Sequence, residues 1–349
     1  MGGVVTFPIG ILDQSPVVAG ATPREAILAT IALARAADRL GYARYWLAEH
    51  HSMHGLSDAS PEVLLARLTA ETSRIRLGTG GIMLPHYSSF KVAETFRMLD
   101  ALAPGRVDLG VGRAPGGVGL VNAALESRNP GLFPEQIQET IGFLEATTPP
   151  SSAYASLHAM PSGPTAPEVW MLGSSDYGAL LAARMGLPYA YAHFIGGDQE
   201  YLTRLYRSRY RPNARHPQPR CIVAAAAIVA PTDEEAADLA LPLRLWRTRI
   251  VRGQGGPIPS LEEARAYPWA PREREESERG RRLIYGSPAT VRHDLEALVE
   301  ENAADEAMIV TITPDYASRL RSYELLADAF ELGSARSPRD VVSGAPLGA

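Results

Sequence analysis

A carboxylate and two adjacent histidines, Glu49-His50-His51, follow directly on the apolar run of residues 45–48. Histidine titrates near neutral pH and a nearby carboxylate can orient its ring, so this group could supply a general base or a hydrogen-bond donor. Successive residues of a strand point to opposite faces, so we expect only one of the two histidines to face a site. On these residues alone, a structural role for the histidine pair is an equal alternative.

Two glycines end a second apolar segment. Gly80 and Gly81 follow residues 75–79 and are succeeded by Ile82 and further apolar side chains. Glycine adopts backbone geometries closed to other residues and lets a flat ligand approach the main chain. The apolar residues that follow could form one wall of a pocket, and a strand bulge is the structural alternative.

Two later loops could hold an anion. Arg113 follows small residues, and its guanidinium is suited to phosphate. The second loop lies before a predicted helix and contains Gly173, Ser174, Ser175 and Gly178, whose hydroxyl and amide groups would form an anion site at the helix amino terminus. Arginine is also common in surface ion pairs and serine in ordinary caps, so the prediction rests on the co-occurrence of the four loops.

The elements that must position these loops alternate between strand and helix. Helix start signals include Thr22-Pro23-Arg24-Glu25, a capping box with proline in the first turn. We predict eight strands, in residues 4–12, 45–48, 75–79, 107–111, 168–172, 187–192, 221–229 and 307–311. This order predicts an α/β fold, the (β/α)8 TIM barrel, in which the loops after the strands converge on one face. An open doubly wound sheet is the alternative. It is less favoured because a dinucleotide-binding sheet carries its glycine-rich loop after the first strand, whereas here that loop follows the fourth.

One domain is expected over residues 1–332. Residues 252–282 interrupt the strand and helix alternation with glycine, proline and then dense charge, so we interpret them as a solvated insertion before the last strand, with a mobile lid as the alternative. Residues 333–349 are expected to form a disordered tail.

Composition limits the classes of function. The 349 residues are 46% apolar and 21% charged, with a net charge of -5, which is typical of a globular protein and argues against a nucleic-acid partner. The single cysteine, Cys221, cannot form an intramolecular disulfide and is expected to lie buried in a strand. Neither a membrane span nor a secretory signal is evident, so we expect a cytoplasmic protein without a membrane partner.

Several motifs together resemble those of one family, the luciferase-like flavin-dependent oxidoreductases, which includes bacterial luciferase. The resemblance covers residues 6–332 in the same order. The matching stretches are Trp46-Leu47-Ala48-Glu49-His50-His51, Gly78-Thr79-Gly80-Gly81-Ile82-Met83-Leu84-Pro85, Pro104-Gly105-Arg106-Val107-Asp108-Leu109-Gly110, Gly112-Arg113-Ala114-Pro115-Gly116, Gly173-Ser174-Ser175 and Gly186-Leu187-Pro188.

The resemblance implies a barrel that binds FMN at the carboxyl ends of its strands. It places the flavin phosphate against Arg113, Ser174, Ser175 and Gly178. It also implies a non-proline cis peptide bond in the loop after the third strand, at Gly80-Gly81 or Gly81-Ile82, against the flavin ring. By the same resemblance, His50 matches the histidine that assists the flavin–oxygen chemistry, with Glu49 in support.

The function implied is a monooxygenase that uses reduced FMN and O2 to oxygenate a small organic substrate. A separate flavin reductase would supply the reduced flavin, and the family suggests a homodimer. One alternative is hydride transfer with a deazaflavin coenzyme on the same fold, and another is a flavin-binding relative without turnover. A metal-dependent hydrolase using His50, His51 and His86 is a further alternative, but it lacks the histidine pair that such barrels carry on the first strand, so no metal is predicted.

The chain departs from the family pattern after the third strand. Many close relatives have Asn-His after the proline there, whereas this chain has His86-Tyr87. The loop position of His54 also varies. No role is assigned to these three residues from the sequence, although each could line the pocket.

Overall fold

Parallel strands and helices alternate through the computed structural model, which describes residues 7–333 except 115, 118, 150 and 279–282. The strands are β1 (Ile9–Asp13), β2 (Arg44–Leu47), β3 (Arg76–Met83), β4 (Val107–Gly112), β5 (Glu168–Gly173), β6 (Tyr189–Ala192), β7 (Cys221–Val229), β8 (Ile284–Gly286) and β9 (Glu306–Val310). The helices are α1 (Pro23–Leu40), α2 (Pro61–Thr69), η1 (Leu84–His86), α3 (Ser89–Leu102), α4 (Gly119–Ala124), η2 (Pro130–Leu132), α5 (Phe133–Glu145), α6 (Asp176–Met185), α7 (His193–Gly196), α8 (Tyr201–Arg209), α9 (Asp233–Val251), α10 (Leu261–Ala266), α11 (Pro271–Glu278), α12 (Pro288–Glu301) and α13 (Tyr316–Ala329).

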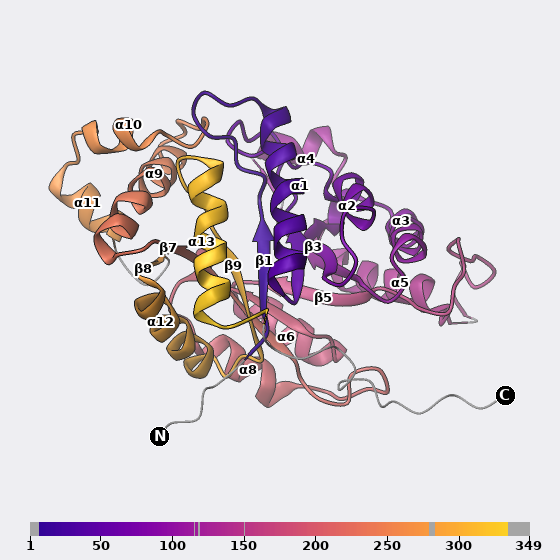
Figure 1. Cartoon of the computed structure of the whole chain (residues 1–349). Helices are drawn as coiled ribbons and strands as arrows, with labels where there is room; N and C mark the ends of the chain where they lie inside the picture. Colours follow the sequence, from indigo (N-terminus) through magenta and orange to yellow (C-terminus); the bar gives the residue numbers. More distant parts are fainter. Residues whose placement is uncertain (1–6, 115, 118, 150, 279–282, 334–349) are drawn as a thin grey trace, which may run out of the picture.

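Eight of these strands close into a barrel. Each strand from β1 to β7 pairs in parallel with the next, β7 pairs with β9, and β9 pairs with β1. Helices surround the strands on the outside (Figure 1). The predicted (β/α)8 barrel is therefore confirmed, and all the loops that follow the strands open toward one end of the molecule.

The start and stop signals of the first helix act as the sequence predicts. The Thr22 side chain accepts a hydrogen bond from the Glu25 amide at 3.2 Å, and the Glu25 carboxylate accepts one from the Thr22 amide at 2.7 Å. These two hydrogen bonds complete the capping box. Gly41 ends the helix with φ of 89°, a left-handed conformation that costs glycine little. Helix α1 thus begins and ends at fixed points, and the chain returns directly into β2.

Two hydrophobic layers stabilise the barrel. The inner layer fills the barrel itself and includes Trp46 and Trp170, whose ring centroids lie 5.5 Å apart at 67°. The outer layer lies between strands and helices and includes Tyr45 and Cys221, both fully buried. The expectation of a buried strand cysteine is confirmed. Because Tyr45 and Trp46 belong to different layers, side chains alternate along β2 between the helices and the barrel interior.

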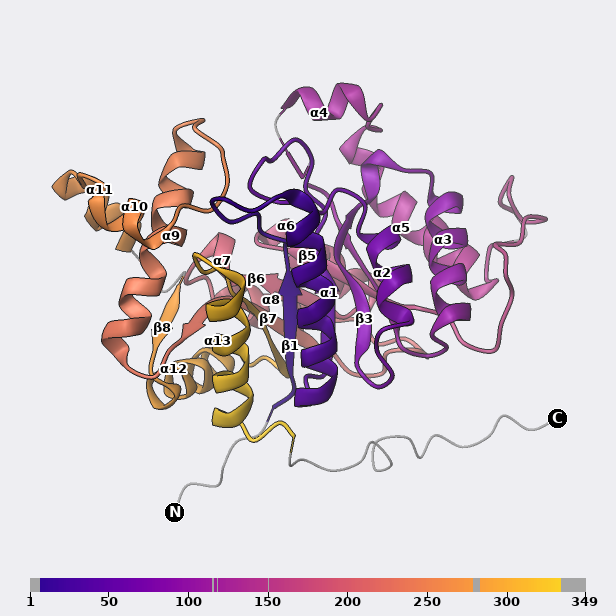
Figure 2. The same ribbon diagram turned by 45° about the horizontal axis from the view of Figure 1, so that its top comes forward.

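Short elements add to the predicted pattern. Strand β8 pairs with the end of β7 outside the eight-stranded ring, and α4 lies above the carboxyl ends of the strands (Figure 2). The predicted residues 4–6 of the first strand and the expected tail from 334 lie outside the described residues. In the part of the chain that the structure describes, no helix is long and apolar enough to cross a membrane.

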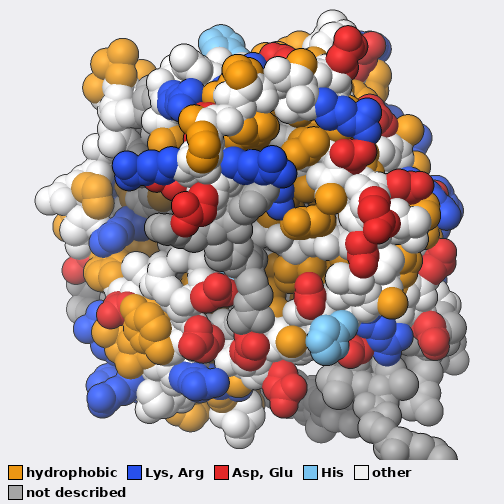
Figure 3. Space-filling view, turned by 90° about the vertical axis from the view of Figure 1, so that its left-hand side faces the viewer, with side chains coloured by type: hydrophobic (Ala, Val, Ile, Leu, Met, Phe, Trp, Pro, Cys, Tyr) orange, Lys and Arg blue, Asp and Glu red, His pale blue; other side chains and the backbone are white. Residues whose placement is uncertain are grey.

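The segment before the last strand packs onto the barrel at its beginning. Ile258 is fully buried, and its backbone exchanges hydrogen bonds with Val17 and Ala19, at 2.7 and 2.8 Å. Further on, Glu273 of α11 forms an ion pair at 2.6 Å with Arg252, the residue directly after α9. Basic and acidic side chains are interspersed on this side of the molecule (Figure 3). The segment is therefore charged on its surface but anchored by a buried contact to the loop after β1.

Candidate active site

A cavity of about 270 Å³ lies at the carboxyl ends of the strands. Most of its wall is apolar, and most of the apolar residues come from strands around the barrel, with others from α5, α7 and the loop after β4. They are Leu12, Trp46, Met83, Ala114, Phe133, Met171, Leu172, Ala190, Ala192, Phe194, Ile195, Ala224 and Met308. A concave apolar site with a few polar groups is the usual form of a cofactor or substrate pocket.

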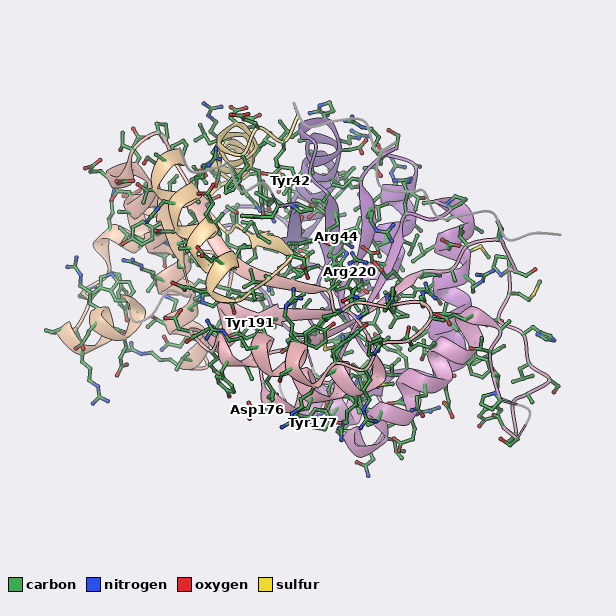
Figure 4. The ribbon with its side chains drawn as sticks, turned by 90° about the horizontal axis from the view of Figure 1, so that it is seen from below. Tyr42, Arg44, Asp176, Tyr177, Tyr191 and Arg220 are labelled. Atoms are coloured by element: carbon green, nitrogen blue, oxygen red, sulfur yellow. The ribbon has the colours of Figure 1, made fainter. Side chains whose placement is uncertain are left out.

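The polar part of the cavity wall comes from the loops after β4 and β5. Arg113, Ser174, Ser175 and Tyr177 line it, and the Arg113 guanidinium lies over the Tyr177 ring at 4.0 Å from its centroid. Tyr177 lies in the first turn of α6 (Figure 4). The Ser175 side chain, at the N-cap of α6, makes no capping hydrogen bond there. A cation, two hydroxyls and a helix amino terminus therefore converge, which is an arrangement suited to a phosphate group.

Two glycines let the end of β5 and the first turn of α6 come together. A Cβ atom on Gly178 would lie 3.3 Å from the Cα of Gly173, and a Cβ on Gly173 would meet the Gly178 Cα at the same distance. Both residues line the cavity. The lack of side chains at these two positions leaves backbone atoms as the surface that a ligand would contact.

The peptide bond between Gly80 and Gly81 is cis, which is one of the two positions expected for a cis bond. Gly80 lines the cavity. Gly81 packs behind it, because a Cβ there would lie 2.2 Å from the Leu172 side chain. Ile82 is buried and does not border the cavity. The loop after β3 thus contributes its main chain at Gly80, while its neighbours support it from behind.

Glu49 is buried and accepts hydrogen bonds on both oxygens. Oε1 lies 2.6 Å from Nε2 of His51 and 2.8 Å from the hydroxyl of Tyr87, and Oε2 accepts the Met83 amide at 2.9 Å. The carboxylate therefore links the end of β2 to the end of β3. Met83 also lines the cavity, so the Glu49–His51 pair lies directly behind the cavity wall.

His50 is placed differently from His51. Its Nδ1 is buried and, among the described residues, accepts or donates no hydrogen bond. Burial lowers the pKa of His50 to about 4, against the opposing effect of the Ala48 carbonyl, so the ring is neutral at pH 7. His50 does not border the 270 Å³ cavity, and Glu49 pairs with His51. The sequence did not show which of the two histidines pairs with Glu49, and the structure shows that it is His51.

Tyr87 and His86, which the sequence left unassigned, take part in this region together with Tyr177. Tyr87 binds Glu49, Tyr177 stacks on Arg113, and His86 packs edge-on against His51 with ring centroids 5.6 Å apart. Ligand atoms of Glu49, His51 and His86 all lie within 4.8 Å of one another, so these residues mark where a metal ion could bind. The proposed hydrolase set had His50 in place of Glu49. His54 is exposed in its loop.

A (β/α)8 barrel with an apolar cavity and a phosphate-type subsite at the strand ends defines a cofactor-binding barrel enzyme. A family model described as luciferase-like monooxygenase matches residues 7–306, and the chain belongs to this family of oxidoreductases. YwcH of Bacillus subtilis is 43% identical over 92% of this chain and 98% of its own length. A luciferase-like monooxygenase of Escherichia coli is 36% identical over 93% and 98%. The N-acetyl-S-alkylcysteine monooxygenase of Bacillus subtilis is 35% identical over 92% and 97%.

Solved structures extend the likeness. The crystal structure of apo-MsnO8 has a TM-score of 0.87 and 39% identity, covering 94% of this chain and 98% of that chain. The oxygenating constituent of 3,6-diketocamphane monooxygenase from Pseudomonas putida, in complex with FMN, has a TM-score of 0.68 at 19% identity, over 93% and 97%. An F420-dependent secondary alcohol dehydrogenase with an F420-acetone adduct has a TM-score of 0.65 at 15%, over 93% and 99%. The last two show the shared fold alone.

Proposed function

We propose that this protein is a monooxygenase that uses reduced FMN and O2 to oxygenate a small organic substrate. The observation that carries the proposal is the apolar cavity that ends in Arg113, Ser174 and Ser175 at the amino terminus of α6. A flat apolar ring joined to a phosphate has this distribution of polarity. Bound FMN would supply the electrons and the reaction with O2.

The residues present fit FMN at both of its ends. Arg113 and the first turn of α6, with Ser174, Ser175 and Gly178, would hold the phosphate by charge-assisted hydrogen bonds. Gly80 offers bare main chain, where a Cβ would lie 2.6 Å from the Leu12 side chain. Gly81 and Ile82 would hold that segment from behind. The side chains between these ends are apolar and would keep water from the ring.

His50 and Glu49 remain the proposed catalytic residues. A neutral, buried imidazole can donate or accept one hydrogen bond without a net charge, and this property suits His50 to assist the oxygen chemistry. We expect His50→Ala to lower the rate of substrate oxygenation while FMN affinity stays near that of the wild type. A variant with undiminished turnover would remove the role assigned to His50.

The remaining parts of the proposal concern partners and location. We propose that a separate flavin reductase supplies reduced FMN, because the sequence has no second nucleotide-binding fingerprint. A homodimer is proposed from the family resemblance, and a cytoplasmic location from the single unpaired cysteine, Cys221.

The experiment titrates the purified protein with FMN and with a deazaflavin coenzyme, and then follows O2 consumption after photoreduction of bound FMN. We expect FMN to bind and O2 to be consumed. Arg113→Ala should weaken FMN by ~10-fold or more because a charge-assisted phosphate contact is lost. Arg39→Ala is the matched control, since Arg39 is exposed in the last turn of α1. Tighter binding of the deazaflavin, or an unchanged FMN dissociation constant in Arg113→Ala, would overturn the assignment.

A further inference from the structure

Tyr87 reaches from the segment after β3 to the buried carboxylate at the end of β2. Its hydroxyl donates to Oε1 of Glu49 at 2.8 Å, and the same oxygen accepts from Nε2 of His51 at 2.6 Å. The Met83 amide donates to Oε2 at 2.9 Å. Glu49 is only 1% exposed, so protein donors replace water around the carboxylate.

This arrangement fixes the proton on one nitrogen of His51. The Glu49 carboxylate accepts hydrogen bonds from Tyr87 and Met83 and faces His51 as an acceptor too, so the His51 nitrogen that faces it carries the proton. That nitrogen is Nε2, which leaves the lone pair of the neutral ring on Nδ1. Because 14% of the His51 side chain is exposed, the ring can exchange protons with its surroundings.

The ring is also held in place by its neighbours. His51 packs edge-on against His86 at 5.6 Å between ring centroids. Its backbone amide donates to the Gly116 carbonyl at 2.8 Å, in the loop that also carries Arg113. A Cβ on Gly116 would lie 3.2 Å from the side chain of Met83, which borders the cavity. His51 thus lies between the loop after β4 and the wall of the proposed FMN cavity.

We propose that Glu49 and Tyr87 position His51 as a proton acceptor for the reaction, with Tyr87 acting through Glu49. A proton taken up on Nδ1 would give an imidazolium whose charge Glu49 balances, while Nε2 keeps its own proton. This inference rests on the proposed function for the reaction that uses the proton, but the tautomer and the role of Tyr87 follow from the hydrogen bonds alone.

Other titratable groups surround the pair and belong to several elements. Burial raises the pKa of Tyr87, further helped by the charge of Glu49, so its hydroxyl remains a donor at all relevant pH values. Burial likewise raises the pKa of Glu62 on α2, and His51 opposes that rise. Further titratable groups near the pair are His50, Asp58 and His86. Tyr87 is the one that can be removed as a donor without changing charge, so it is the residue to vary.

The first measurement needs no cofactor. Long-range ¹H–¹⁵N spectra of the full chain with ¹⁵N-labelled histidine, assigned with His51→Gln, report which ring nitrogen of His51 carries the proton. We expect the Nε2–H form near pH 8 in the wild type. The Nδ1–H form would overturn the inference whatever the reaction of the protein turns out to be.

The second measurement compares kcat/KM against pH for the wild type, Tyr87→Phe and Tyr42→Phe. Loss of the Tyr87 hydroxyl makes Glu49 a stronger acceptor for the imidazolium, so the acid limb should move to higher pH by about 0.5 unit. Tyr42→Phe is the matched control, because the buried Tyr42 hydroxyl donates to the Tyr323 carbonyl at 2.7 Å and Tyr42 precedes β2, whereas Glu49 follows the opposite end of that strand. FMN affinity should be unchanged in both variants.

Outcomes separate the two proposals. An unmoved acid limb in Tyr87→Phe, or an equal movement in Tyr42→Phe, would overturn the role of Tyr87 and leave the monooxygenase proposal intact. If the wild type consumed no O2 with reduced FMN, the monooxygenase proposal would fail, and the His51 tautomer and its titration in Tyr87→Phe would still test the positioning by NMR.

Discussion

Burial favours the neutral form of two side chains beside the candidate site, His50 and Asp58. It lowers the pKa of His50 to about 4 and raises the pKa of Asp58 to about 8, where the charges of Asp13 and Glu62 add to the rise. The two are joined through the main chain, since the His50 amide donates to the Asp58 carbonyl at 2.9 Å. At pH 7 neither side chain is mostly charged.

Asp58→Asn should flatten the pH dependence of stability. The native state keeps a proton on Asp58 up to about pH 8, whereas the unfolded chain releases it near its ordinary pKa of 3.8. The native state therefore binds more protons across this window, and stability falls as pH rises. As pH rises from about 5 to about 8, we expect the free energy of unfolding of the variant to increase by on the order of 3 kcal/mol relative to that of the wild type.

Urea unfolding at several pH values measures this difference. Asp328→Asn is the control, because Asp328 is exposed on the last turn of α13 and should give a wild-type profile. Parallel profiles for Asp58→Asn and the wild type would mean that Asp58 is ionised in the folded protein.

Chelation should leave activity unchanged. Ligand atoms of Glu49, His51 and His86 lie close enough for a metal ion, but three hydrogen bonds already occupy the Glu49 carboxylate. A metal ion would have to displace the His51 or Tyr87 contact. We expect EDTA-treated and untreated protein to turn over at the same rate, with metal content by mass spectrometry well below one equivalent. Stoichiometric zinc together with loss of activity on chelation would restore the metal-dependent hydrolase as an alternative.

The sequence singled out three of the four polar side chains that line the cavity, Arg113, Ser174 and Ser175, but not their partners. Arg113, Ser174 and Ser175 were recognisable because loops after parallel strands converge. The choice between His50 and His51 was not, because β2 ends at Leu47 and strand alternation no longer holds beyond it. Tyr87 was visible only as a departure from the family pattern, since its contact to Glu49 spans 38 residues of sequence.

At the scale of elements, the register of β3 on β4 depends on a missing side chain. A Cβ on Gly110 would lie 2.0 Å from the Thr79 carbonyl oxygen. Backbone cannot yield as a flexible side chain could, so we expect Gly110→Ala to cost at least ~3 kcal/mol of the free energy of unfolding. Gly119→Ala is the control, since a Cβ there meets nothing within 4 Å. Denaturant unfolding compares the two, and equal stabilities would mean that the strands can separate at this point.

All eight strands of the ring and helix α1 were predicted from the sequence, including the four-residue strand β2, whereas several other short elements were not. Helix α1 has its capping box and terminal glycine, and β7 is a nine-residue apolar run. Helices α4 and α7 have six and four residues, and β8 has three. Such lengths are too short to show a hydrophobic period, and tertiary contacts determine their conformation.

At the scale of the whole molecule, the end of the barrel opposite the cavity holds a buried ionic network. The Asp108 carboxylate accepts hydrogen bonds from Arg44 at 2.7 Å, from Arg76 at 2.5 Å and from the Trp46 indole at 2.9 Å. Arg44 also pairs with Glu306 at 2.7 Å, and Arg220 extends the network to that carboxylate at 3.2 Å. Arg44 and Arg220 appear near one another in the view from below (Figure 4). Charges at this amino-terminal end serve stability, because catalytic groups of such barrels lie at the other end.

Removing one charge from this network should destabilise the barrel but leave the cavity wall in place, because the amide oxygen in Asp108→Asn can still accept a hydrogen bond from the indole of Trp46. Burial alone would raise the pKa of Asp108, but Arg44 and Arg76 hold it below its ordinary value, so the carboxylate is ionised in the folded protein. Asp108→Asn leaves Arg44 buried with one acidic partner fewer, which should cost ~3–5 kcal/mol. Because the pKa of Asp108 is lower in the folded protein than in the unfolded chain, where it is 3.8, the ionised carboxylate stabilises the fold above that pH, and this stabilisation is lost as pH falls. The difference in free energy of unfolding between Asp108→Asn and the wild type should therefore shrink in acid.

Urea unfolding at neutral and acidic pH, with FMN titration of the folded protein, tests this division between the two ends of the barrel. Arg272→Ala removes an exposed pair with Glu276 on α11, and its urea midpoint should stay close to that of the wild type because exposed pairs contribute little. FMN affinity should be the same in Asp108→Asn and wild type. A loss of FMN affinity that matches the loss of stability would mean that the network and the cavity unfold as one unit, and the amino-terminal end could then not be varied independently of the site.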